Sequence, residues 1–95
     1  MPPPQKGHKI LVYHDTQFRW IMQNRSGFNE LVIEMAAAVN GQKLVATLPR
    51  IVNHSMITSA IDFGRKNGWT PDKEAPAFQC KYLRGSFHMP PAATD

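Results

Sequence analysis

Four short apolar stretches separated by turn-forming residues occupy the first half of the chain. The stretches span residues 10–13, 18–22, 28–37 and 43–48, and residues 14–17, 24–27 and 39–42 separate them. Apolar and polar side chains alternate along the stretches, as they do in strands that bury one face and expose the other. The pattern predicts an antiparallel meander of four strands.

The strand register is predicted from the condition that apolar side chains of paired strands share one face. This condition places Trp20 opposite Ile33. If Asn40-Gly41 is a two-residue turn, which needs positive φ at both positions, Ile33 also lies opposite Leu48. A turn at Asp15-Thr16 adds the first strand. The predicted core face consists of Leu11, Tyr13, Phe18, Trp20, Met22, Leu31, Ile33, Met35, Leu44, Ala46 and Leu48.

Residues 53–68 carry the signature of one helix. Asn53 is a good N-cap, apolar residues recur at helical spacing after it, and Gly68 follows the last turn. Residues 77–83 alternate again and predict a fifth strand. The predicted fold class is α+β, in the order ββββαβ, with the helix packed on one face of the sheet.

A chain of 95 residues builds one core, so we expect a single domain. Residues 1–8 and 86–95 are rich in Pro and small residues, which predicts a flexible N-terminal tail and a C-terminal tail around a domain at residues 9–85. Phe87 and Met89 are apolar enough to dock on that domain. The composition, 42% hydrophobic and 19% charged, excludes wholesale disorder and coiled coil.

No segment has the length or apolarity of a membrane anchor. The longest apolar run, residues 35–39, is far below the about 20 residues that cross a bilayer. The first residues lack the apolar centre of a secretory signal, so we expect a cytoplasmic protein. Because Cys80 is the only cysteine of this sequence, it cannot form an internal disulfide.

The sequence offers no established pattern of catalytic or metal-ligating residues. The four histidines lack the spacing of a zinc site, and no nucleophile elbow or glycine-rich phosphate loop is present. We therefore expect no enzyme activity, no metal and no cofactor. His14, Asp15 and His54 could act as general acid and base if the fold brought them together, which makes an acid-base enzyme the third hypothesis.

The basic charge raises nucleic-acid binding as a second hypothesis. The net charge of +4 and the pI of about 9.6 are compatible with it, but the basic residues are spread along the chain. Trp20 is predicted to face the core while Arg19 faces away, so the aromatic ring and the charge are not presented together. Such a net charge also serves ordinary solubility.

The face of the sheet opposite the core carries the leading hypothesis. Ile10, Ile21 and Val32 are predicted to lie side by side as an apolar row that either forms an interface or lies under a tail. We expect a homodimer that is self-complementary through the charges beside this row. The predicted interface residues are Ile10, Val12, Arg19, Ile21, Val32 and Glu34.

A groove beside the helix is the second predicted binding region. Trp69, Tyr82 and the aromatic residues of the C-terminal tail could enclose a small apolar or cationic ligand there. No motif identifies a function. The leading interpretation is a non-catalytic binding or adaptor module that self-associates, without membrane contact.

Several local motifs carry a family resemblance. Phe18-Arg19-Trp20, the Asn-capped helix, residues 67–71 (Asn-Gly-Trp-Thr-Pro) and the strand opening at Phe78 together resemble small uncharacterised bacterial proteins of the kind found as integron gene-cassette products. The resemblance covers residues 9–83. It implies a small α+β domain, often oligomeric, and supplies no catalytic residues.

Overall fold

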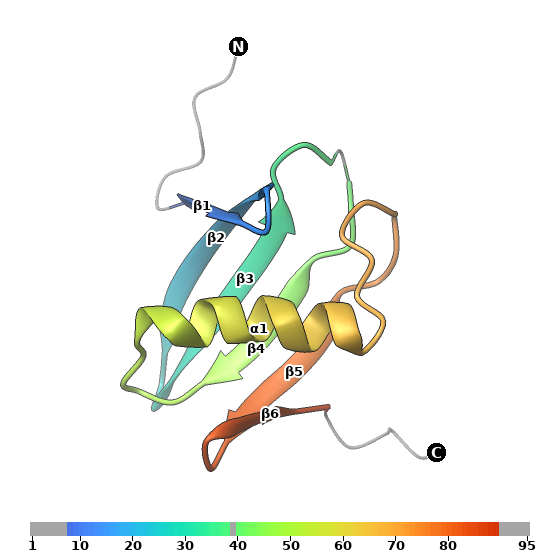
Figure 1. Cartoon of the computed structure of the whole chain (residues 1–95). Helices are drawn as coiled ribbons and strands as arrows, with labels where there is room; N and C mark the ends of the chain where they lie inside the picture. The colour runs from blue at the N-terminus through green and yellow to red at the C-terminus, as the bar shows by residue number, and fades with distance from the viewer. Residues whose placement is uncertain (1–7, 39, 90–95) are drawn as a thin grey trace.

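The computed structural model describes residues 8–38 and 40–89 (Figure 1). Its elements follow the predicted order, with one strand more at the C-terminal end. The helix follows the fourth strand and precedes the fifth along the chain, and it covers one face of the sheet (Figure 1). The elements are β1 (Lys9–Tyr13), β2 (Thr16–Arg25), β3 (Phe28–Met35), β4 (Leu44–Leu48), α1 (His54–Lys66), β5 (Phe78–Leu83) and β6 (Ser86–His88).

The six strands form one mixed sheet in which spatial order equals chain order. β1 to β4 form the predicted antiparallel meander. β5 runs parallel to β4, because α1 carries the chain back along the sheet between them. β6 then pairs antiparallel with β5. The α+β class is confirmed, while the parallel pair and the sixth strand correct the predicted sheet.

β6 lies in the segment that the sequence places in the C-terminal tail. Arg84 and Gly85 have φ values of 52° and 86°, which suit a tight two-residue hairpin turn. The turn brings Phe87 back to the core, where its ring centroid lies 5.0 Å from that of Tyr82. The gain from burying Phe87 explains why the sheet extends beyond residue 85.

The first three strands keep the predicted faces. Trp20 lies opposite Ile33, so the β2–β3 register is confirmed. The β1–β2 turn, however, is at residues 14–15, where both φ values are positive, and not at Asp15-Thr16. The register of β1 thereby differs from the predicted one by two residues, and an even shift leaves every side chain on its predicted face.

The connection between β3 and β4 differs more from the prediction. Asn40-Gly41 is not a two-residue turn, and Ile33 lies opposite Leu44 instead of Leu48. Residues 41 and 42 of the connection contact residues 69–76. Gly41 lies so close to Pro71 that a Cβ would stand 1.9 Å from its carbonyl oxygen. The backbone N–H next to it, at position 42, donates to the carbonyl of residue 73 at 2.7 Å. These tertiary contacts explain the longer connection.

The helix begins and ends with the predicted caps. Asn53 Oδ1 accepts a hydrogen bond from the Met56 N–H at 3.1 Å. At the other end Gly68 has a φ of 103°, and the Trp69 N–H donates to the Gly64 carbonyl at 2.8 Å, as in a Schellman motif. The buried side of α1 consists of Met56, Ile57, Ala60, Ile61 and Gly64.

Candidate functional site

The face of the sheet that α1 leaves uncovered, here called the open face, has an apolar centre. Ile21, Val32 and Val45 are paired across the three central strands β2, β3 and β4. All three side chains are half-buried. The centre is therefore a shallow apolar strip whose flanks are polar.

Ile10 and Val12 are the most exposed apolar residues of this surface. They are 56% and 65% exposed, because β1 is the first strand of the sheet. Ile10 lies opposite Arg19 and not beside Ile21, which corrects the predicted continuous row of Ile10, Ile21 and Val32. The position of the β1–β2 turn causes this difference. The two most exposed apolar side chains of the open face therefore lie on its β1 edge.

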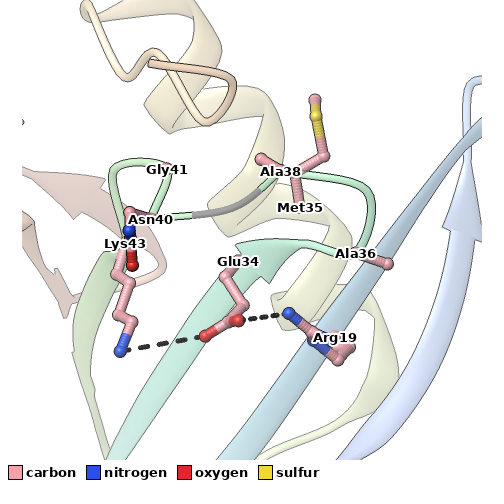
Figure 2. Close-up of a pocket in the computed structure, with 8 residues that line it drawn as sticks. All are labelled: Arg19, Glu34, Met35, Ala36, Ala38, Asn40, Gly41 and Lys43. Atoms are coloured by element: carbon pink, nitrogen blue, oxygen red, sulfur yellow. Dashed lines mark hydrogen bonds and ion pairs between the residues drawn. The ribbon is translucent and has the colours of Figure 1, made fainter. Parts of the chain in front are cut away.

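One flank of the open face is a row of three charged side chains. Arg19 Nη2 donates to Glu34 Oε1 at 2.6 Å, and Lys43 Nζ lies 3.9 Å from Glu34 Oε2. Figure 2 shows Glu34 between the two basic side chains. The row borders a hollow of about 340 Å³, which is lined on the other side by Ala36, Ala38, Asn40 and Gly41. Arg19 and Glu34 are neighbours, as the predicted pairing of Trp20 with Ile33 implies, and Lys43 completes the row.

The opposite flank of the open face carries a second ion pair, between Arg25 and Glu30. Arg25 Nη2 donates to Glu30 Oε1 at 2.8 Å and to Gln23 Oε1 at 2.6 Å. Arg19, Arg25 and Lys43 therefore all have carboxylate partners within the chain. An anionic polymer would have to compete with Glu30 and Glu34 for these cations.

The second predicted binding region is not a groove. Trp69 is only 2% exposed and stacks on Phe18 with ring centroids 5.9 Å apart. Its indole Nε1 donates to the carbonyl of Gln42 at 2.9 Å. Tyr82 is half-buried and its ring contacts Phe87. Trp69 is thus a core residue and not the wall of a ligand site. Its ring fits against the helix because Gly64 has no side chain there.

The predicted acid-base group does not assemble. His14 lies beside Asp62 of α1, with Nε2 4.0 Å from Oδ1. His54 is eight residues before Asp62 on the same helix, which places it about 12 Å away along the axis. No pattern in the sequence indicated Asp62, which lies on the exposed side of α1.

Tyr13 joins the contact between His14 and Asp62. Its hydroxyl donates to Asp62 Oδ2 at 2.7 Å, and its ring centroid lies 4.2 Å from that of His14. The hydrogen bond to Asp62, desolvation and the negative charge of Asp62 together raise the pKa of Tyr13 above its usual 10.0. His14 and Asp62 are 76% and 60% exposed, so this contact lies in solvent and does not form a catalytic cleft.

Cys80 is the remaining reactive side chain. It is buried on the core face of β5, and burial raises the pKa of its thiol from 9.0 to about 12. Within residues 8–38 and 40–89, no three His, Cys, Asp or Glu side chains gather in a way that would hold a metal ion. In the same part of the chain, no helix is long and apolar enough to cross a membrane.

Comparison of the chain with known protein families, curated proteins and solved structures found no match.

Proposed function

We propose that this chain is a non-catalytic binding module that works as a self-associated pair of copies. The contact surface in this proposal is the open face together with its free edge at β1. One observation supports it above the others: Ile10 and Val12, two strongly exposed apolar residues, lie together on the outer strand of the uncovered face. A small domain gains much of its stability from such additional burial.

The charges around this surface are compatible with a second copy as the occupant. Within each chain the two flanking carboxylates, Glu30 and Glu34, offset two of the three positive charges of Arg19, Arg25 and Lys43, which limits the repulsion between two identical surfaces. Two chains of net charge +4 repel each other over long distances. We therefore expect association to tighten with salt, because salt screens the repulsion and leaves apolar contact unweakened.

Light scattering at two protein concentrations and two salt concentrations tests the proposal. We expect a mass near twice 10.7 kDa that persists or increases at high salt. Val12→Glu places a charge on the exposed edge and is expected to weaken association at least tenfold while leaving the chain folded. Ser59→Glu is the control, since it adds the same charge at an exposed position of α1, which covers the other face of the sheet.

A mass of 10.7 kDa under all four conditions would overturn the proposal. Nucleic-acid binding predicts the opposite salt response, because phosphate contacts weaken steeply as salt rises. A monomer that binds an oligonucleotide at low salt and releases it at high salt would favour that function instead.

A further inference from the structure

We infer that two copies pair edge to edge through β1, antiparallel, with Leu11 opposite Leu11 on the two-fold axis. The two six-stranded sheets then continue into one sheet. This inference rests on the proposed self-association and specifies its geometry. The occupant of the β1 edge is a second copy of this chain.

The two edges of the sheet differ in how they are protected. Natural sheets protect edges by short strands, charge, proline or bulges. β6 is only three residues long, whereas β1 has five and carries a single charge, Lys9, at its start. Among the described residues, none pairs with the outer side of β1. β1 is therefore the edge that can accept another strand.

The turn determines which backbone groups of β1 point outward. A two-residue turn is closed by a hydrogen-bonded pair, here Tyr13 and Thr16. Bonded and non-bonded pairs alternate along an antiparallel ladder, so Lys9, Leu11 and Tyr13 direct their backbone groups to β2. Ile10 and Val12 direct their N–H and C=O groups to the free side. These four groups are the donors and acceptors for an added strand.

The register follows from the pattern of β1 itself. Antiparallel pairing about Leu11 uses all five residues and keeps like faces together. It sets Ile10 of each copy opposite Val12 of the other as hydrogen-bonded pairs, so the outward backbone groups satisfy each other. It sets Lys9 opposite Tyr13, where the ammonium group meets an aromatic ring and no like charge.

This register also brings together the exposed apolar side chains of β1. The Ile10 and Val12 side chains of both copies gather on the open face, where each now contacts its partner across the strand pair. A register centred on Ile10 pairs only Lys9, Ile10 and Leu11 of β1 with one another. One centred on Val12 sets Ile10 against His14 in the turn, whose backbone cannot continue the ladder. Only the register about Leu11 fits the whole strand.

A cysteine scan along β1 tests the register. In a non-bonded antiparallel pair the Cα atoms are about 4.5 Å apart, a distance that a disulfide spans. We expect Leu11→Cys to form a covalent dimer under mild oxidation. The control Lys9→Cys places the two sulfur-bearing residues about 13 Å apart, beyond the reach of a disulfide. The native Cys80 is buried and does not compete.

A proline variant provides a second test that leaves the core unchanged. Val12→Pro removes an outward N–H, and proline is tolerated at such edge positions because no ladder bond within the chain is lost. We expect this variant to be folded, as measured by circular dichroism, and monomeric in light scattering.

The outcomes separate the inference from the proposed function. A cross-linked dimer with Leu11→Cys alone supports the pairing about Leu11. If the wild type is a dimer but only Ile10→Cys or Val12→Cys cross-links, or no β1 cysteine variant does, the inference is overturned. The proposed self-association would still stand. A wild type that is monomeric throughout overturns both. A folded Val12→Pro variant that remains a dimer also overturns the inference.

Discussion

The Trp69 indole and the backbone of Gln42 are joined by a hydrogen bond of 2.9 Å. Gln42 Oε1 also accepts from the N–H and the hydroxyl of Thr70, at 2.7 and 3.1 Å. Gln42, in the β3–β4 connection, is therefore hydrogen-bonded to two residues that closely follow α1, Trp69 and Thr70. Because Trp69 stacks on Phe18, this contact joins the connection, the end of the helix and the core.

We expect Gln42→Ala to lower the free energy of unfolding by about 1–3 kcal/mol, since it leaves the half-buried Thr70 N–H without its acceptor. The variant also loses the bond from Gln42 Nε2 to the Pro76 carbonyl. Urea unfolding followed by circular dichroism measures the effect. Gln79→Ala, on the exposed side of β5, is the control, and equal stability of the two variants would contradict the role given to Gln42.

Gly41→Ala should disturb the same region by steric contact. The added Cβ would meet the Pro71 carbonyl oxygen at 1.9 Å, so backbone has to move, at a cost of about 1–3 kcal/mol. The indole N–H resonance of Trp69 should shift, because its acceptor is the next residue along. Gly85→Ala strains a turn with open space around it and should leave that resonance in place. An unshifted Trp69 signal in Gly41→Ala would refute the close approach.

Cys80 should resist thiol reagents in the folded protein. With a pKa raised to about 12, its thiolate is almost absent at pH 8, and the sulfur is buried. We expect slow reaction with Ellman's reagent in buffer and rapid reaction in concentrated urea. Rapid reaction of the native protein would contradict this burial.

The same shift makes stability fall at high pH. The folded state holds the Cys80 proton more tightly than the unfolded state, so this contribution is complete below about pH 9 and is lost as pH rises towards 12. Urea unfolding between pH 8 and 11 measures the slope. Cys80→Ala should flatten it, and an equal slope in both proteins would assign the loss to other groups.

Asp62→Ala should bring the pKa of Tyr13 back towards its usual value, since it removes both the hydrogen-bond acceptor and the negative charge. Ultraviolet titration of tyrosine in a Tyr82→Phe background isolates the signal of Tyr13. Asp72→Ala provides the control for a lost carboxylate elsewhere. An unchanged Tyr13 titration in Asp62→Ala would show that the hydroxyl does not contact Asp62 in solution.

The faces of the strands were predictable from sequence, and the registers only in part. Alternation assigns a face without reference to the rest of the fold, and the β2–β3 register followed because Trp20 and Ile33 belong to strands joined by a short turn. The β3–β4 register depends on Pro71, which lies about thirty residues further along the chain. Local pattern carries no information about such a contact.

The candidate site shows the same division. The neighbours Arg19 and Glu34 followed from the β2–β3 register. The burial of Trp69 did not, although Gly64 within the helix was a usable signal: a Cβ there would stand 2.9 Å from the Trp69 ring. The contact of Asp62 with Tyr13 could not be predicted either, because it depends on where the β1–β2 turn lies relative to the helix.

The parallel pairing of β4 and β5 has a consequence for the order of folding. The hairpins between β1 and β2 and between β2 and β3 close short loops, a process of roughly 1–10 μs. The pairing of Leu44 with Phe78 must instead close a loop that contains the whole helix, so we expect it to limit the folding rate. The contacts of Gln42 with Trp69 and Thr70 close a shorter part of the same loop, so we expect them to form in the rate-limiting step. Substitutions there should slow folding and leave the unfolding rate nearly unchanged.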